Sequence, residues 1–86
     1  MINRNDNPVG WAMFLSELED AHEHLGDLIK EMSADLEYSE PELRIDLGHV
    51  YAHLNRAWHR CQVAEDLTEA EWEAARAFPN DLEPVA

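Results

Sequence analysis

The chain divides at residues 36–43, Leu-Glu-Tyr-Ser-Glu-Pro-Glu-Leu, into two long segments that each carry a helical pattern of apolar residues. Ser39 and Glu42 have the spacing of a capping box, in which the Ser39 hydroxyl accepts from the Glu42 N–H and the Glu42 carboxylate reaches back to Ser39. Tyr38 and Leu43 can form the accompanying hydrophobic staple. This stretch therefore predicts a turn followed at once by the start of a helix.

The segment before this turn has the period of an amphipathic helix. Asn7 followed by Pro8 is a helix-start signal, because an Asn cap accepts a free N–H and Pro lacks one. Apolar residues then recur at spacings of three and four, at Trp11, Phe14, Leu15, Leu18, Ala21, Leu25, Leu28, Ile29, Met32 and Leu36. The pattern predicts a helix over about residues 8–36.

A second helix is predicted over about residues 40–66. Its apolar stripe contains Leu43, Leu47, Val50, Tyr51, Leu54, Ala57, Trp58, Cys61 and Ala64. Thr68 and Glu71 repeat the capping-box pattern, so a short helix is expected over about 69–78, before Pro79. Residues 79–86 are expected to form an extended tail. The whole chain, 1–86, is predicted to be one all-α domain.

Two long helices joined by a short turn pack as an antiparallel hairpin. A turn centred near residue 38 or 39 places opposite each other residues whose numbers sum to about 78. One hairpin leaves its lateral apolar side chains wet, so a second copy is expected to complete a dimeric four-helix bundle. The candidate interface residues of this homodimer are Trp11, Phe14, Leu18, Leu25, Tyr51, Leu54, Trp58 and Trp72.

The composition is strongly acidic. Nineteen Asp and Glu residues stand against six Lys and Arg residues, a formal net charge of −13 with neutral histidines. This charge excludes binding to nucleic-acid phosphates and favours a basic protein partner. No apolar run is long enough to span a membrane, and no signal peptide is evident, so a cytoplasmic protein is expected. The first functional prediction is a non-enzymatic interaction module without a cofactor.

Histidines provide an alternative, a metal-binding or pH-sensing bundle. His22 falls within the first apolar stripe, where it is either a hydrogen-bonded core imidazole or a metal ligand beside Glu19 or Cys61. Asp46, His49 and His53 follow one flank of the second helix, as a solvated face or as ligands of a transition metal. The two remaining histidines, His24 and His59, are predicted to lie at the surface.

Glu19-Asp20-Ala21-His22-Glu23 and Asp46-Leu47-Gly48-His49 together resemble the paired acidic motifs of the all-α MazG-type nucleoside triphosphate pyrophosphohydrolases. In that family the acidic side chains hold Mg²⁺, which bridges the triphosphate and the attacking water. The resemblance implies Mg²⁺ ligands at Glu19, Asp20, Glu23 and Asp46, with His49 in the place of the last carboxylate. A metal-dependent hydrolase is thus a second alternative.

Overall fold

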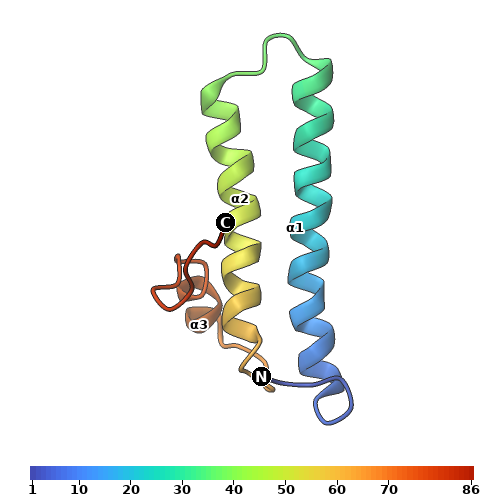
Figure 1. Cartoon of the computed structure of the whole chain (residues 1–86), viewed down its shortest axis with the longest axis vertical. Helices are drawn as coiled ribbons and strands as arrows, with labels where there is room; N and C mark the ends of the chain where they lie inside the picture. The colour runs from blue at the N-terminus through green and yellow to red at the C-terminus, as the bar shows by residue number, and fades with distance from the viewer.

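A computed structural model describes residues 1–86 as three helices without strands: α1 (Pro8–Ala34), α2 (Glu40–Arg60) and α3 (Glu69–Ala74). Figure 1 shows α1 and α2 side by side as an antiparallel hairpin, with α3 and the C-terminal segment beside α2 on the side away from α1. The predictions of an all-α fold and a helical hairpin are confirmed. None of the helices combines the length and apolarity that crossing a bilayer requires.

All three helices begin where the sequence predicts, because helix starts depend on local signals. Pro occupies the first turn of α1 and of α2. At α3 the capping box is complete, since Thr68 Oγ1 accepts from the Glu71 N–H at 3.2 Å and Glu71 Oε1 accepts from the Thr68 N–H at 3.0 Å. At α1 the predicted side-chain cap is absent, because Asn7 accepts no hydrogen bond from the first turn. At α2 the box predicted for Ser39 is absent too: the Ser39 hydroxyl donates to the Glu42 carboxylate at 3.3 Å instead.

The helices end earlier than predicted, α1 at Ala34 rather than 36, α2 at Arg60 rather than 66, and α3 at Ala74 rather than 78. At the end of α2 the cause is tertiary. The Cys61 carbonyl, which a continuing helix would pair within itself, accepts from the N–H of Ile2 at 2.8 Å. The chain then crosses the start of α1 so closely that a Cβ on Gly10 would lie 2.7 Å from the Ala64 carbonyl oxygen.

The seam between α1 and α2 is lined by small and polar residues rather than by the largest apolar ones. Along α1 the buried positions are Gly10, Glu17, Ala21 and Leu28. Along α2 the buried seam positions are Val50, Ala57 and Arg60, whereas the buried Asn55 and Arg56 are covered by α3 and the segment after it. Of the two predicted apolar stripes, only Ala21 and Leu28 of the first, and Val50, Ala57 and Cys61 of the second, are buried within this chain.

Six further large apolar side chains lie on one side of the hairpin. Each follows a seam residue by one position, which places it about 100° further round its helix. Because α1 and α2 run antiparallel, this rotation places the six residues of the two helices on the same side of the hairpin. We call this surface the apolar face and define it by Leu18, Leu25 and Ile29 of α1 and Tyr51, Leu54 and Trp58 of α2, each 36% to 57% exposed.

The other candidate interface residues lie near the start of α1 and on α3. Trp11 and Phe14 are half-buried near the start of α1, with their rings 5.5 Å apart in an edge-to-face arrangement. Trp72, on α3, lies under the guanidinium of Arg56, whose Cζ atom is 3.5 Å from the ring centroid. Trp72 therefore holds α3 against α2 through a cation–π contact.

Candidate metal centre

Three histidines meet across the hairpin seam. His24 comes from the middle of α1, and His49 and His53 lie one turn apart on α2. The ring centroids are 4.1 Å apart for His24 and His49, 5.1 Å for His24 and His53, and 4.9 Å for His49 and His53. One nitrogen from each ring lies within 4.8 Å of the other two. We call this group the imidazole cluster.

The register of the hairpin brings these rings together. The loop occupies residues 35–39, so its centre is earlier than predicted. Gly10 and Ala64, which are in close contact, have numbers that sum to 74, and the numbers of His24 and His49 sum to 73. The predicted sum of about 78 is therefore too large by about four residues, or roughly one helical turn.

Glu17 orients the ring of His53. Its Oε2 atom lies 2.8 Å from Nδ1 of His53, and both side chains are largely buried. An ionised carboxylate can only accept, so the proton of the neutral ring is on Nδ1. The lone pair is then on Nε2, which is buried and has no hydrogen-bond partner. A histidine whose second nitrogen donates to a carboxylate is the usual arrangement of a metal ligand.

The surroundings of His49 favour its neutral form. Although His49 is exposed as a residue, partial desolvation lowers the pKa of its imidazole, and the nearby His24, His53 and Arg56 lower it further, against an opposing effect of Asp46. A neutral imidazole is the form that binds a metal ion. The cluster thus disfavours protonation of His49 while offering nitrogen lone pairs to a cation.

The donor set fits a transition metal ion. If all three nitrogen–nitrogen distances were 4.8 Å, an ion midway between the three nitrogens would lie about 2.8 Å from each of them. Each nitrogen would then have to move by less than about 1 Å to reach the Zn–N distance of about 2.0–2.1 Å. Imidazole nitrogen suits Zn²⁺, Cu²⁺, Ni²⁺ and Co²⁺, whereas Mg²⁺ and Ca²⁺ require oxygen ligands. The rings of His24 and His53 are stacked with an interplanar angle of 13°, so coordination also requires His24 and His49 to turn until their nitrogen lone pairs point at the same ion as that of His53.

Most of the acidic and histidine positions predicted as ligands lie outside the cluster. His22, Glu19 and Glu23 are exposed, and Asp20 is half-buried. Asp46 instead accepts a hydrogen bond from the Tyr38 hydroxyl at 2.7 Å. The imidazole cluster is the one group of three or more potential ligand side chains that converges.

Two expectations about single histidines are corrected. His22, predicted to lie within the apolar stripe, is exposed and lies apart from the buried Cys61, whereas His24, predicted to lie at the surface, is half-buried within the seam. The signal for His24 is its position three residues after Ala21 and four before Leu28, both buried. This signal could be recognised only after the line of seam residues was distinguished from the apolar face.

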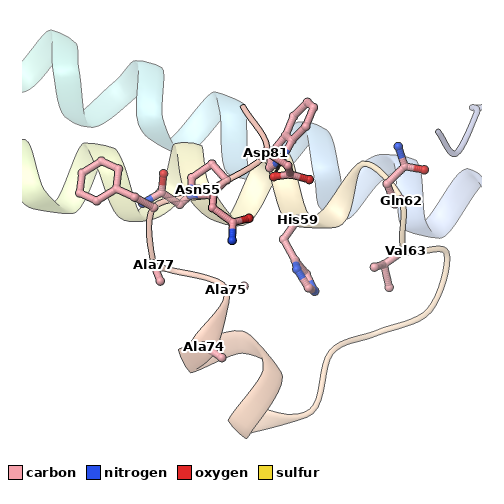
Figure 2. Close-up of a pocket in the computed structure, with 12 residues that line it drawn as sticks. Asn55, His59, Gln62, Val63, Ala74, Ala75, Ala77 and Asp81 are labelled. Carbon is pink, nitrogen blue, oxygen red and sulfur yellow. Dashed lines mark hydrogen bonds between the residues drawn. The ribbon is translucent and has the colours of Figure 1, made fainter. Parts of the chain in front are cut away.

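A separate hollow lies between α2 and the C-terminal segment. Its volume is about 490 Å³, and Figure 2 shows Asn55 and His59 of α2 facing the segment that carries Ala74, Ala75 and Asp81. No residue of the imidazole cluster lines it. His59 is exposed, as predicted, and belongs to no ligand group.

The geometry of the cluster therefore carries the functional argument. Two of its three histidines, His49 and His53, belong to the set predicted from the sequence, and the third, His24, comes from the structure. No family model, curated protein or solved structure matches the chain.

Proposed function

We propose that the protein binds one divalent transition metal ion of the zinc class through His24, His49 and His53. The observation that carries this proposal is the state of the His53 ring. Its Nδ1 is fixed by the Glu17 carboxylate, its Nε2 is buried and without a partner, and one nitrogen of its ring lies within 4.8 Å of a nitrogen of each of the two other imidazoles. A buried polar atom without a partner is costly, and coordination would remove that cost.

Metal binding would also join the two long helices. His24 lies on α1 and the other two ligands lie on α2, so the ion would crosslink the hairpin near its middle. The chain is short, has one cysteine and cannot form an internal disulfide. Small domains of this kind often gain stability from a metal or from oligomerisation. The bound ion is therefore expected to raise the unfolding temperature of the protein.

The test is a zinc titration of the metal-free protein in competition with a chromophoric chelator. We expect one ion per chain, with His24→Ala weakening the affinity at least about 100-fold, because one of three ligands is lost. His22→Ala is the matched control, since His22 is exposed on the same helix and should leave the affinity unchanged. Equal affinities of the His24→Ala and wild-type proteins would overturn the proposal.

A second candidate function, self-association as a four-helix bundle, is favoured by the apolar face. The exposed Leu15 and Met32 lie beside this face on α1. On α2 it is bordered by the C-terminal segment, whose Phe78 ring meets Tyr51 edge-on at 5.1 Å and whose Asp81 accepts from the Trp58 indole N–H. The occupant of the apolar face would be a second copy of the chain, docking through the same face. The rest of the surface is acidic, which suits a basic protein partner outside the dimer.

A further inference from the structure

We infer that the metal ion of the proposed site keeps an open coordination position and binds an oxyanion there; this inference rests on the proposed function. The guanidinium of Arg56 would be the second contact of the anion. The first ground is the number of ligands. Only three side chains converge on the cluster, whereas zinc in proteins takes at least four ligands. Three protein ligands and one exchangeable position are the arrangement of catalytic and ligand-binding sites, rather than of closed structural sites.

The chain has no fourth side chain positioned to close the site. The Glu17 carboxylate is engaged with His53. Asp46, three residues before His49, accepts from the Tyr38 hydroxyl. Because His49 is exposed, the fourth position would open to solvent, where water or a ligand can reach it.

The second ground is Arg56, which is a buried cation without an anion. It is 5% exposed, yet no carboxylate oxygen lies within 4.0 Å of its guanidinium, in a chain with nineteen acidic residues. Its Nε donates to the Trp72 carbonyl at 3.2 Å, and the Trp72 ring covers one face of the guanidinium. The other buried arginine, Arg60, lies within 4.0 Å of the carboxylates of both Glu17 and Asp66.

Arg56 also lies beside the cluster. It follows His49 by seven residues and His53 by three, so the three side chains share one side of α2. The Arg56 guanidinium has no carboxylate partner, and its nitrogens that make no hydrogen bond reach solvent, where they can donate to a negative ligand beside the metal site.

The ligand class follows from these two contacts. A carboxylate or a phosphoryl group has two or more oxygens, so one oxygen can bind the metal while another accepts from the guanidinium fork. A neutral ligand such as imidazole would bind the metal ion without a contact to Arg56. The dependence of binding on Arg56 therefore separates an oxyanion site from a bare open coordination position.

The experiment uses the full chain loaded with Co²⁺, whose visible absorption reports ligands entering the metal shell. Acetate and inorganic phosphate are titrated separately, and the two series distinguish a carboxylate from a phosphoryl ligand. We expect a saturable spectral change with at least one of them, and an affinity about 10-fold lower in Arg56→Gln. Arg44→Gln, which removes an exposed arginine of the same helix, is the matched control and should keep the wild-type affinity.

Arg56→Lys is a second variant that keeps the positive charge but loses the paired N–H donors of the guanidinium, so it controls for a folding defect in Arg56→Gln. Its affinity for the oxyanion should fall between those of the wild type and Arg56→Gln. Imidazole should bind all four cobalt proteins equally. A cobalt spectrum that ignores both oxyanions, or oxyanion binding unchanged in Arg56→Gln, would overturn this inference while leaving the metal site intact. Failure to bind cobalt at all would instead overturn the proposed function.

Discussion

The Nδ1 atom of His53 lies 2.8 Å from the Oε2 atom of Glu17, across the seam between α2 and α1. This contact fixes both the rotation of the imidazole ring and the nitrogen that carries its proton. It also explains why a glutamate is buried in the seam. The carboxylate has the His53 ring as its partner, with the Arg60 guanidinium 3.9 Å away on its other oxygen.

Replacing Glu17 by Gln should weaken zinc binding without removing a ligand. The amide has nearly the shape of the carboxylate but no charge, so it would hold the His53 ring less firmly and make Nε2 less basic. Losses of this kind are typically 10- to 100-fold, and we expect about 10-fold in a chelator competition assay. Glu19→Gln, at an exposed position two residues away, should have the wild-type affinity. Equal affinities of the Glu17→Gln and Glu19→Gln proteins would show that the Glu17–His53 contact plays no part in binding.

Two glycine substitutions should have opposite effects on the free energy of unfolding. Gly10→Ala places a Cβ 2.7 Å from the backbone oxygen of Ala64, which cannot move aside as a side chain could, so we expect a loss of about 1–3 kcal/mol. Gly26→Ala meets nothing within 4 Å and improves helix propensity, so we expect a gain of about 0.5–1 kcal/mol. Urea unfolding of the two metal-free variants measures both changes in the free energy of unfolding. A stabilised Gly10→Ala would mean that the end of α2 does not pack against α1 as described.

Local chemistry accounts for what the sequence predicts well. The starts at Pro8, Glu40 and Glu69 depend on residues within one turn of each start, and all three are correct. The helix ends, in contrast, do not depend on nearby residues alone. The end of α2 depends on Ile2, about sixty residues away, whose N–H pairs with the Cys61 carbonyl, so the pattern of apolar residues alone predicts a helix that is too long.

The candidate site depends on the register of the hairpin, which the sequence predicts less well. In α1 the large apolar residues Leu18 and Leu25 mark the apolar face, while the adjacent positions Glu17 and His24 lie in the seam. Because a core is usually apolar, the pattern assigns the seam to the wrong line of residues. His49 and His53 are recognisable as a pair one turn apart, but their partner His24 follows only from the observed seam.

Self-association through the apolar face should be sensitive to one charge placed within it. Ile29→Asp buries a carboxylate in the proposed interface, so the protein should become monomeric. Ile45→Asp is the matched control. Ile45 is 74% exposed and lies about half a turn round α2 from Leu54, away from the apolar face. Light scattering after gel filtration gives the masses.

Salt gives a second check on the same dimer. Each copy carries a formal charge of −13, so screening by salt should strengthen association. A wild-type protein that is monomeric at all salt concentrations, or an Ile29→Asp protein that remains dimeric, would contradict docking through this face.

The capping box of α3 should be visible in a pH titration. The backbone N–H and the hydroxyl of Thr68 hold the pKa of the Glu71 carboxyl below its ordinary value of 4.5. Since the folded pKa is the lower one, the stabilisation of α3 is complete above pH 4.5 and is lost as the pH falls through the folded pKa. Thr68→Ala should raise the Glu71 pKa towards 4.5, as measured by carboxyl carbon NMR. An unchanged pKa in that variant would mean that the Thr68 hydroxyl contributes nothing to the box.

X-ray absorption of the zinc-loaded full chain tests the central claim most directly, because it reads the ligand set without any substitution. We predict three imidazole nitrogens at about 2.0–2.1 Å from the zinc and one further nitrogen- or oxygen-donor ligand. Binding through the carboxylates of Glu19, Asp20, Glu23 and Asp46 would instead give an oxygen shell without the multiple-scattering signal of three imidazole rings. That result would contradict a metal site at His24, His49 and His53.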